Sequence, residues 1–530
     1  MEENKEVIEE NKDKEIIRDR KEVLRKFSAR FFSKENYPLL FVLGLAIIIQ
    51  VYFLLKTFNQ PLWWDEAVYL LKSKAIAFGT PDVGVNRGRA LFNSFLWAGL
   101  FKIGLTEHAF RIIQTILSVV SVGLVYKIMH SITKNKFVAF FSGFSLAVCW
   151  VVAYATTRFF PDTTGLFLWL LMIFLFWKGY AEESRVIPKY FYWIGPVFVA
   201  ASYAREMNLM FVGIIFIYMF AKEKFSLFKK KEVYILIGIT LLAAVPFFLY
   251  YYNMFGNPIE NWTYRFSALE FNTPEAAADE GVPWGTSTYF RYMPDYFGWI
   301  IIILLLTGLI YLSKVVLGLD LIFKNKKTDM DHLFLLLLWI IIPFAYIAFQ
   351  IKLYDERYIL IIYPAVYAVA GYALYNIKEY ASKKISKILA WLLIIVVLFF
   401  IFYPHFQRAD SLIEQKLTSY AQVKDAGLWI EDNSNAGDII FAQSQPQLVY
   451  YAEKSVFPLS PYQNETDFIK NITSSRPKYL VLSIFENHPP WAYSFPQNNP
   501  NLVTPVQAYM INDQQPALVI YQFNYTGTDF

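Results

Sequence analysis

Long apolar runs recur throughout this chain and constrain its fold more than any other feature. A helix needs roughly 20 apolar residues to cross a bilayer, and inside the bilayer its backbone groups must bond within the helix. Only 18% of the 530 residues are charged and 56% are hydrophobic, so a fully water-soluble fold is excluded. We predict a polytopic α-helical membrane protein with eleven spans, at 38–58, 108–129, 137–157, 163–180, 190–204, 207–221, 232–252, 296–313, 333–350, 358–376 and 388–403.

The placement of lysine and arginine predicts the orientation of these spans. Cytoplasmic loops collect basic residues, whereas loops on the other side do not. With the charged N-terminal tail 1–37 in the cytoplasm, every second loop is basic, for example around Lys134, Lys230 and Lys383. An odd number of spans then places segment 404–530 outside, so we expect a multi-pass protein of the cytoplasmic (plasma) membrane. Four Asn-X-Thr sequons lie in the segments assigned outside, at Asn261, Asn464, Asn471 and Asn524.

The N-terminal tail and the cysteine content exclude three further features. The tail lacks the short basic start and apolar core of a signal peptide. Cys149 is the single cysteine, which excludes an intrachain disulfide and a cysteine-built metal site.

The segment after Pro404 has the composition of a soluble domain. Because strands alternate with helices there, we expect an extracytoplasmic α/β domain over 404–530. It contains no glycine-rich phosphate loop, and we assign it no nucleotide. The expected elements are helices at 420–431 and 447–452 and strands at 438–442, 479–483 and 517–523.

Two long outside loops are predicted between the spans. The first, 59–106, contains amphipathic stretches at 66–78 and 90–103 that are typical of helices lying in the membrane interface. The second, 253–295, is rich in Pro, Asn, Glu and Ala and is expected to form a lid or an irregular loop.

The first loop opens with adjacent carboxylates, Asp65 and Glu66, after Trp63 and Trp64. An ordinary loop start within an aromatic belt explains this pattern as well as a functional site does. The functional interpretation is a general base with a helper carboxylate.

Ionisable residues at membrane depth form a second pattern, because such groups are costly and usually functional. For each pair, mutual neutralisation in the bundle is about as good an explanation as ligand contact. Together the arginines would suit a phosphate, which a guanidinium binds through two parallel hydrogen bonds. The residues are Arg158 with Asp162, Arg205 with Glu206, Asp355 to Tyr358, and Arg87 and Arg89 in the first loop.

These motifs, in this order, resemble the polyprenyl-phosphate-sugar-dependent GT-C glycosyltransferases. The closest likeness is to the protein mannosyltransferase and aminoarabinose transferase group, including its archaeal and bacterial members, and it covers residues 38–403. Where that group often has a Lys-Pro-Pro-Leu-like element, this chain has Arg89 to Phe92. The resemblance is carried by Trp64-Asp65-Glu66-Ala67-Val68-Tyr69, Arg87-Gly88-Arg89-Ala90-Leu91-Phe92, Glu107-His108-Ala109-Phe110-Arg111, Arg158 with Asp162, and Glu356-Arg357-Tyr358.

The resemblance implies transfer of a sugar from a polyprenyl (dolichyl or undecaprenyl) phosphate to an acceptor hydroxyl, with inversion, at the outer membrane face. Asp65 would be the general base, supported by Glu66 or by Asp162 paired with Arg158. The donor phosphate would contact Arg87, Arg89, Arg158, Arg205 and Arg357, and the sugar and acceptor pocket would hold Trp64, Tyr69, Glu206, Glu356 and Tyr358.

No cofactor is required by this chemistry, although Asp65 and Glu66 could share a divalent metal. The expected partners are the lipid-linked donor, a protein, lipid or glycan acceptor and membrane lipids, with no nucleic acid. A transporter or lipid flippase is the alternative, and its charged pairs would lie near mid-membrane, whereas those of a transferase would gather at the outer face. A third possibility is a catalytically silent scaffold whose C-terminal domain binds a partner.

Overall fold

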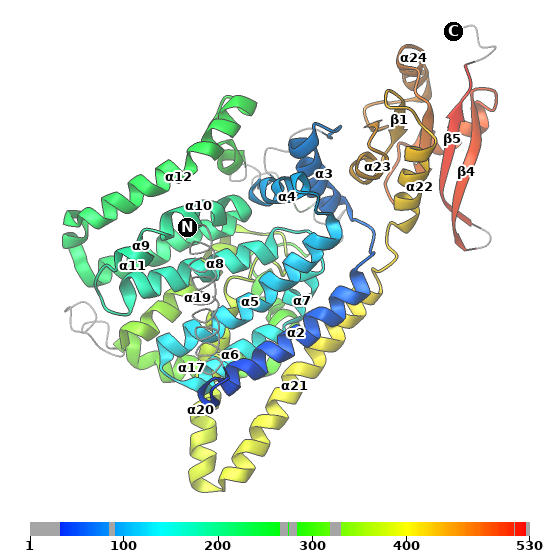
Figure 1. Cartoon of the computed structure of the whole chain (residues 1–530). Helices are drawn as coiled ribbons and strands as arrows, with labels where there is room; N and C mark the ends of the chain where they lie inside the picture. Colours follow the sequence, from blue (N-terminus) through cyan, green and yellow to red (C-terminus); the bar gives the residue numbers. More distant parts are fainter. Residues whose placement is uncertain are drawn as a thin grey trace, which may run out of the picture.

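The structure is a computed structural model that describes residues 32–83, 89, 91–264, 274, 283–317, 330–512 and 515–525. A bundle of helices is followed by a smaller domain that contains a sheet (Figure 1). Most of the N-terminal tail, Arg87 and much of the predicted loop 253–295 lie outside the described residues.

The bundle confirms that each predicted apolar run contains helix. In chain order its helices are α2 (Tyr37–Thr57), α5 (Glu107–Thr133), α6 (Lys136–Val148), α7 (Trp150–Thr156), α8 (Asp162–Phe176), α9 (Pro188–Phe191), α10 (Ile194–Ala204), α11 (Met210–Glu223), α12 (Lys231–Phe255), α15 (Thr288–Arg291), α16 (Met293–Phe297), α17 (Trp299–Leu317), α19 (Met330–Gln350), α20 (Tyr363–Lys384) and α21 (Lys387–Glu414).

Fewer of these helices meet the criteria for a span than the eleven that the apolar runs predict. Within the described ranges, six are long and apolar enough to cross a membrane, or seven if the bent pair α6 and α7 forms one span. Part of the difference arises because some runs form short helices. The run 190–204 contains the end of α9 and the 11-residue α10, and 207–221 lies mostly in the 14-residue α11.

Two predicted spans contain a break in the helix. The third bends by 53° at Cys149, whose backbone is extended, and the His405 ring accepts a 3.5 Å hydrogen bond from the Trp150 N–H that starts α7. The tenth predicted span, 358–376, begins with turns, and its helix α20 starts only at Tyr363. In a continuous helix, the backbone N–H and C=O groups bond to one another. At both breaks, some of these groups are left free to bond to other parts of the protein, near charged residues.

Helix α21 also continues past the predicted domain boundary at residue 404. It runs through Pro404 to Glu414, and Lys56 at the end of α2 forms ion pairs with Asp410 (2.7 Å) and Glu414 (2.6 Å). The first and last long helices therefore lie side by side (Figure 1).

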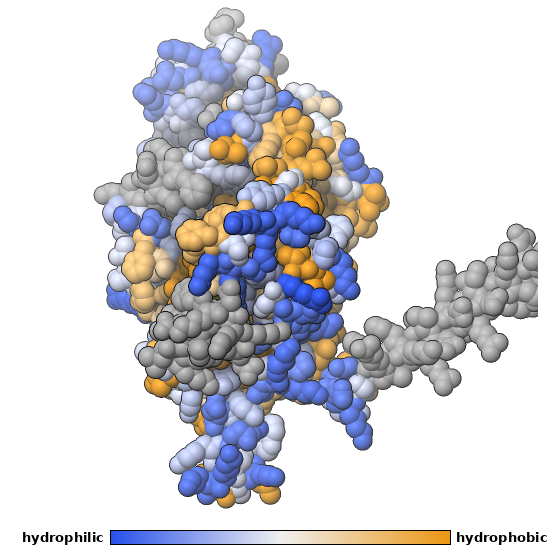
Figure 2. Space-filling view, turned by 90° about the vertical axis from the view of Figure 1, so that its left-hand side faces the viewer, coloured by the Kyte–Doolittle hydropathy of each residue, from blue (hydrophilic) through white to orange (hydrophobic). Residues whose placement is uncertain are grey.

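The surface seen in Figure 2 separates apolar from hydrophilic regions. Hydrophobic side chains gather in its upper half, and the lower tip, where α20 meets α21, is mostly hydrophilic. That tip carries Lys383, Lys384 and Lys387, three of the residues predicted to face the cytoplasm.

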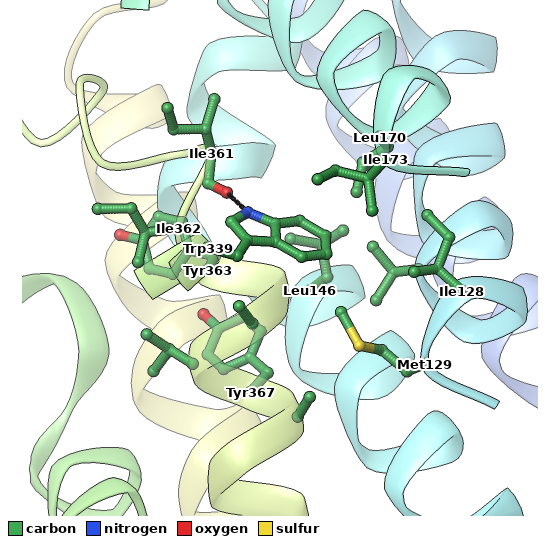
Figure 3. Close-up of a cluster of buried hydrophobic side chains, with 14 of the residues drawn as sticks. Ile128, Met129, Leu146, Leu170, Ile173, Trp339, Ile361, Ile362, Tyr363 and Tyr367 are labelled. Carbon is green, nitrogen blue, oxygen red and sulfur yellow. Dashed lines mark hydrogen bonds between the residues drawn. The ribbon is translucent and has the colours of Figure 1, made fainter. Parts of the chain in front are cut away.

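A buried core fixes the start of α20 against the bundle (Figure 3). The Trp339 indole N–H donates a 2.6 Å hydrogen bond to the Ile361 carbonyl, and Met129 of α5 and Ile173 of α8 lie on the other side of the Trp339 ring in the same buried cluster. Since Ile361 follows the charged segment 355–358 directly, this core positions those charges.

The first of the two long loops, which we predicted to lie outside, folds as two helices, as predicted. They are α3 (Trp64–Phe78), which ends at Gly79 with φ +71°, and α4 (Phe92–Lys102). A glycine adopts this left-handed conformation at the end of a helix without steric cost.

The C-terminal domain is an α/β domain with a mixed sheet in the order β2-β1-β3-β5-β4. Strands β1 and β3 are parallel, whereas β5 is antiparallel to both β3 and β4. Helices α22 and α23 cover one face of the sheet, and α24 and α25 cover the other. The elements are α22 (Ala421–Asp432), β1 (Ile439–Ala442), α23 (Gln445–Ala452), β2 (Ser455–Phe457), α24 (Glu465–Ser475), β3 (Tyr479–Ser483), α25 (Pro490–Asn498), β4 (Val503–Asn512) and β5 (Gln515–Phe523).

The five predicted elements of this domain are all present. The sequence interpretation missed β2, β4, α24 and α25, because short or polar segments with proline carry a weak periodic signal.

The C-terminal domain packs on the helices of the first loop. The Tyr451 hydroxyl accepts a 2.9 Å hydrogen bond from the Leu62 backbone N–H, and Lys74 forms a 2.7 Å ion pair with Glu453. Apolar residues of α3, α4, α22 and α23 form one buried cluster. Helix α3 is therefore held between the bundle and the C-terminal domain.

Candidate active site

Asp65 lies in the first turn of α3 and forms an ion pair with Arg89. The Arg89 guanidinium donates to the Asp65 carboxylate and lies 5.2 Å from the centre of the Tyr69 ring. The Asp65 side chain is 40% exposed, which leaves its carboxylate accessible to another molecule.

Glu66, the next residue, is completely buried and has a different environment. Its carboxylate accepts backbone hydrogen bonds from Trp63 (2.8 Å) and Phe159 (3.0 Å). Its Oε2 lies 3.6 Å from the Arg158 guanidinium, which packs 3.7 Å from the centre of the Trp63 ring. Glu66 and Arg158 thus join the start of α3 to segment 157–160.

Asp162 begins α8 and pairs with Arg205 at the end of α10, with Nη2 and Oδ1 2.9 Å apart. The prediction that Asp162 pairs with Arg158 is therefore wrong. Arg205 can reach Asp162 because α10 ends at an extended residue, and its guanidinium lies 4.9 Å from the Tyr358 ring. The pair satisfies two buried charges at the helix ends, where isolated ions would be costly.

Asp355 and Arg357 form the fourth charged pair, in the turns before α20. The Arg357 Nε donates to both Asp355 carboxylate oxygens, at 2.9 and 3.0 Å. Burial acts to raise the pKa of Asp355, but the charge and hydrogen bonds of Arg357, with the charge of Arg205, hold it below its ordinary value. Asp355 is therefore ionised at neutral pH.

Segment 157–162 brings these pairs together. Phe159 binds Glu66 through its backbone, and the Phe160 ring lies 4.4 Å from the Arg357 guanidinium. Asp162 ends the segment and is close enough for its charge to act on Arg357. One short connection thus links the exposed Asp65 region to the buried pairs of Arg205 and Arg357.

The other predicted pocket residues lie around the same charges. Tyr69 packs under Arg89, Tyr358 faces Arg205, and Trp64 precedes Asp65 in α3. Glu206 follows Arg205 and its charge acts on both Arg205 and Asp162. Burial, and then the charge of Asp355, raise the pKa of Glu356.

Three residues that the sequence analysis names without assigning them a role in the site also shape it. Arg111 of α5 donates to the Thr157 and Gln60 carbonyls, both at 2.9 Å, and so fixes both connections beside the site. Trp63 packs on Arg158, and Asp355 is the principal partner of Arg357. An arginine near the start of an apolar helix was a usable signal for Arg111.

The candidate divalent site does not fit the geometry. Both Glu66 carboxylate oxygens accept backbone hydrogen bonds, and Asp65 is directed to Arg89. In the part of the chain that the structure describes, there is no cluster of three or more His, Cys, Asp or Glu side chains suited to a metal ion. We derive no step through a metal.

An apolar groove of about 310 Å³ lies between α17 and α21, with a charged rim. Trp299, Phe400 and Ile401 contribute apolar surface, and Asp295 and Arg408 at the rim are 3.5 Å apart. The charges of this rim act on Tyr354, which adjoins Asp355. The groove therefore opens close to the charged segment 354–358.

The sequence and the structure were compared with those of known proteins. Residues 89–250 match the model of the dolichyl-phosphate-mannose-protein mannosyltransferase family. ArnT from Cupriavidus metallidurans, solved bound to undecaprenyl phosphate, shares 12% identity over 92% of this chain and 98% of its own, with a TM-score of 0.59. The chain has the fold of the GT-C glycosyltransferases.

A second structural neighbour of this chain is the Archaeoglobus fulgidus oligosaccharyltransferase, solved tethered to an acceptor peptide containing the NVT sequon. It shares 13% identity, 86% of this chain and 70% of that one are covered, and the TM-score is 0.58. The same archaeal enzyme, AglB, was also solved with an inhibitory peptide and a dolichol-phosphate, with a TM-score of 0.54. No curated protein sequence matches the chain.

Proposed function

We propose that this glycosyltransferase transfers a sugar from a polyprenyl phosphate to an acceptor hydroxyl, with inversion, and that Asp65 is the general base. The observation that carries the proposal is the exposed Asp65 carboxylate, ion-paired with Arg89, beside the buried arginine pairs at the same end of the bundle. The ArnT neighbour bound to undecaprenyl phosphate supports this donor class.

The proposed orientation follows from the distribution of charge. Asp65, Asp162, Arg205 and Arg357 lie at helix ends on the side of the C-terminal domain, opposite the lysine-rich turn between α20 and α21. With that turn in the cytoplasm, the site and the C-terminal domain face the outside of the cytoplasmic membrane. There the donor has to arrive on a lipid, because nucleotide sugars are made in the cytoplasm.

In the proposed reaction the acceptor oxygen attacks the anomeric carbon while the bond from that carbon to the phosphate oxygen breaks. The acceptor proton passes to Asp65, and the polyprenyl phosphate leaves as a monoester. This leaving group gains one negative charge, so cations placed beside it lower the barrier.

Three arginines are placed to take that charge. Arg89 is partly exposed next to Asp65, and Arg205 and Arg357 lie beyond Phe160 with aromatic rings stacked on them. When the donor binds, Arg89 would exchange Asp65 for the phosphate, which frees the carboxylate to act as a base. Arg87, also predicted to contact the donor phosphate, lies outside the described residues.

Arg158 and Glu66 would position other residues and would not contact the donor or the acceptor. Both side chains are completely buried, and Trp63 covers the Arg158 guanidinium. They would hold the start of α3 and segment 157–162 at a fixed distance, which keeps Asp65 in register with Arg205 and Arg357.

The apolar groove between α17 and α21 is the proposed location of part of the isoprenoid chain. Trp299 and Phe400 are exposed at its sides, as expected for a surface that contacts lipid. Its charged rim lies next to segment 354–358, so a chain in the groove would bring its phosphate toward Arg357.

The proposal is tested with the purified protein in vesicles that contain a polyprenyl-phosphate sugar. Asp65→Asn should lower sugar release and transfer about 10²- to 10⁴-fold, the usual contribution of a general base. Asp82→Asn is the matched control, because Asp82 is also an ion-paired aspartate of the first loop, bound to Lys72 at 2.8 Å. Wild-type rates in Asp65→Asn would remove Asp65 from the mechanism.

The same vesicles test the alternative function. A flippase would move labelled lipid between leaflets without releasing polyprenyl phosphate. The charged pairs lie at helix ends and not in helix middles, which favours the transferase. Lipid movement without sugar release by the wild-type protein would overturn the proposed function.

A further inference from the structure

A carboxylate of the C-terminal domain lies near the proposed base and has no role in the mechanism above. Glu486 belongs to the connection between β3 and α25, and its Oε1 is buried without a hydrogen-bond partner among the residues that the structure describes. A buried carboxyl oxygen without a partner is costly, so it needs an explanation.

Tyr420 is close enough to both Glu486 and Asp65 for their charges to act on it. The negative charges of both carboxylates act on its phenol, and together with burial they raise the pKa of Tyr420. Its ring contacts that of Phe485, with 5.5 Å between the centroids. The phenol of Tyr420 therefore brings the connection after β3 to the same region as the first turn of α3.

The backbone of Tyr420 is also unusual. Its φ is +64°, a left-handed conformation that is uncommon for a residue with a side chain and especially for a bulky one. The carbonyl accepts hydrogen bonds from Val423 and Lys424, both at 3.1 Å, so the start of α22 holds this conformation. Strained residues of this kind are concentrated at functional sites.

The connection that carries Glu486 is anchored at both ends. The His488 ring accepts a 3.2 Å hydrogen bond from the Ser483 backbone N–H at the end of β3. On the other side of the site, Gln60 donates a 2.7 Å hydrogen bond to the Lys416 carbonyl, close to Tyr420. The first bond holds the connection against the end of β3, and the second joins the segment before α3 to the segment before Tyr420.

Glu486 also lies at a position in the sheet where ligands commonly bind. The chain passes from β1 to β2 on one side and places β3 on the other side of β1, so the strand order reverses between β1 and β3. In open α/β sheets, ligands bind outside the carboxyl ends of the strands at such a point. Glu486 follows the carboxyl end of β3.

We propose, on the basis of the proposed function, that Glu486 binds a hydroxyl-bearing peptide acceptor and orients it toward Asp65. The carboxylate accepts a hydrogen bond from an acceptor N–H or O–H next to the reacting hydroxyl, whose own proton goes to Asp65. A peptide is chosen because the matched family model is that of protein mannosyltransferases and the archaeal neighbour holds an acceptor peptide.

Burial raises the pKa of Glu486 to about 7, which makes the contact sensitive to pH. The ionised carboxylate accepts hydrogen bonds from the acceptor, and its fraction rises as the pH passes through 7. Acceptor kcat/KM should therefore increase between about pH 6 and 8 in a manner that depends on Glu486.

The test uses the full-length protein in vesicles with a polyprenyl-phosphate sugar and a synthetic peptide containing serine and threonine. Glu486→Gln keeps the shape and removes the charge, and it should raise the acceptor KM about tenfold, as expected for a lost charge-assisted hydrogen bond. Donor KM and hydrolysis of the donor by water should remain within about twofold of wild type, and the pH dependence near 7 should disappear. The control is Glu431→Gln, an exposed glutamate of α22 in the same domain.

Two results would overturn the proposal. One is an unchanged acceptor KM and pH profile in Glu486→Gln while Asp65→Asn remains inactive, which rejects the role of Glu486 and leaves the proposed function standing. The other is a wild-type protein that hydrolyses the donor at the same rate with and without peptide, which rejects a peptide acceptor. Full activity in Asp65→Asn would instead refute the function itself.

Discussion

The carboxylate of Glu66 accepts a 3.0 Å hydrogen bond from the backbone N–H of Phe159. This bond connects the helix that carries Asp65 with the segment that leads to Asp162, although the two lie far apart in the sequence. The adjacent acidic residues Asp65 and Glu66 therefore divide their tasks, since one is exposed for chemistry and the other is buried for positioning.

Replacing Glu66 with glutamine should destabilise the protein strongly. The amide cannot neutralise Arg158, and breaking a buried pair by removing one partner typically costs about 3–5 kcal/mol. The measurement is the unfolding temperature in detergent. Glu453→Gln is the control, because its partly exposed ion pair with Lys74 is worth about 1 kcal/mol or less. An unfolding temperature of Glu66→Gln equal to that of wild type would contradict the positioning role.

Exchanging Arg205 for lysine should impair use of the donor more than folding. Lysine keeps the charge beside Asp162 but loses the planar fork that binds a phosphate and packs on Tyr358. We expect the donor KM to rise about tenfold, with little change in the unfolding temperature. The control is the opposite exchange, Lys74→Arg, at a residue that pairs with Glu453 of the C-terminal domain. It should leave the donor KM unchanged. Equal donor saturation curves for Arg205→Lys and wild type would argue against phosphate contact.

Acid should weaken the packing around α20 through Asp355. The pKa of this carboxyl is below its ordinary value in the folded protein, so the unfolded chain binds more protons between the two values. The stability contributed by the pair with Arg357 is therefore complete above the ordinary pKa and is lost as the pH falls through the folded pKa. Unfolding temperatures between pH 3 and about 6 should fall more steeply for wild type than for Asp355→Asn. Parallel curves would show that the pair contributes nothing to this dependence.

Gly308 should tolerate no side chain, because α17 and α20 touch there. A Cβ at this position would lie 2.3 Å from the Val369 carbonyl oxygen, and overpacking of this kind typically costs about 1–3 kcal/mol. Gly44→Ala is the matched control, since a Cβ at Gly44 meets no atom within 4 Å. The two alanine variants are compared by unfolding temperature and expression level. A Gly308→Ala protein as stable as Gly44→Ala would show that these helices can separate without loss.

Local patterns were sufficient to predict the elements of this fold but not all of their breaks. The apolar runs predicted helix in every case, and the amphipathic stretches of the first loop are α3 and α4. The bend at Cys149 could not be predicted, because it depends on His405, which approaches from α21. A length rule also counts α10 as a span although the helix is only 11 residues long.

The candidate site was predictable in its residue types and not in its pairing. The pattern of charged residues at membrane depth singled out Arg158, Asp162, Arg205 and Arg357, each of which forms an ion pair in the structure. Which carboxylate meets which arginine depends on how α8 and α10 end, so the pairing of Asp162 with Arg205 required the tertiary structure. The exposure of Asp65 and the burial of Glu66 likewise follow from which side of α3 faces the bundle.

The hydrogen bond from Leu62 to Tyr451 spans 389 residues of sequence and has a consequence for biosynthesis. The ribosome releases the helix of Asp65 early, whereas the surface that packs against it is made only after all the helices of the bundle. Until the C-terminal domain has been made, the face of α3 that packs against it remains uncovered. The site is thus completed only after α21, the last long helix of the bundle, has been synthesised.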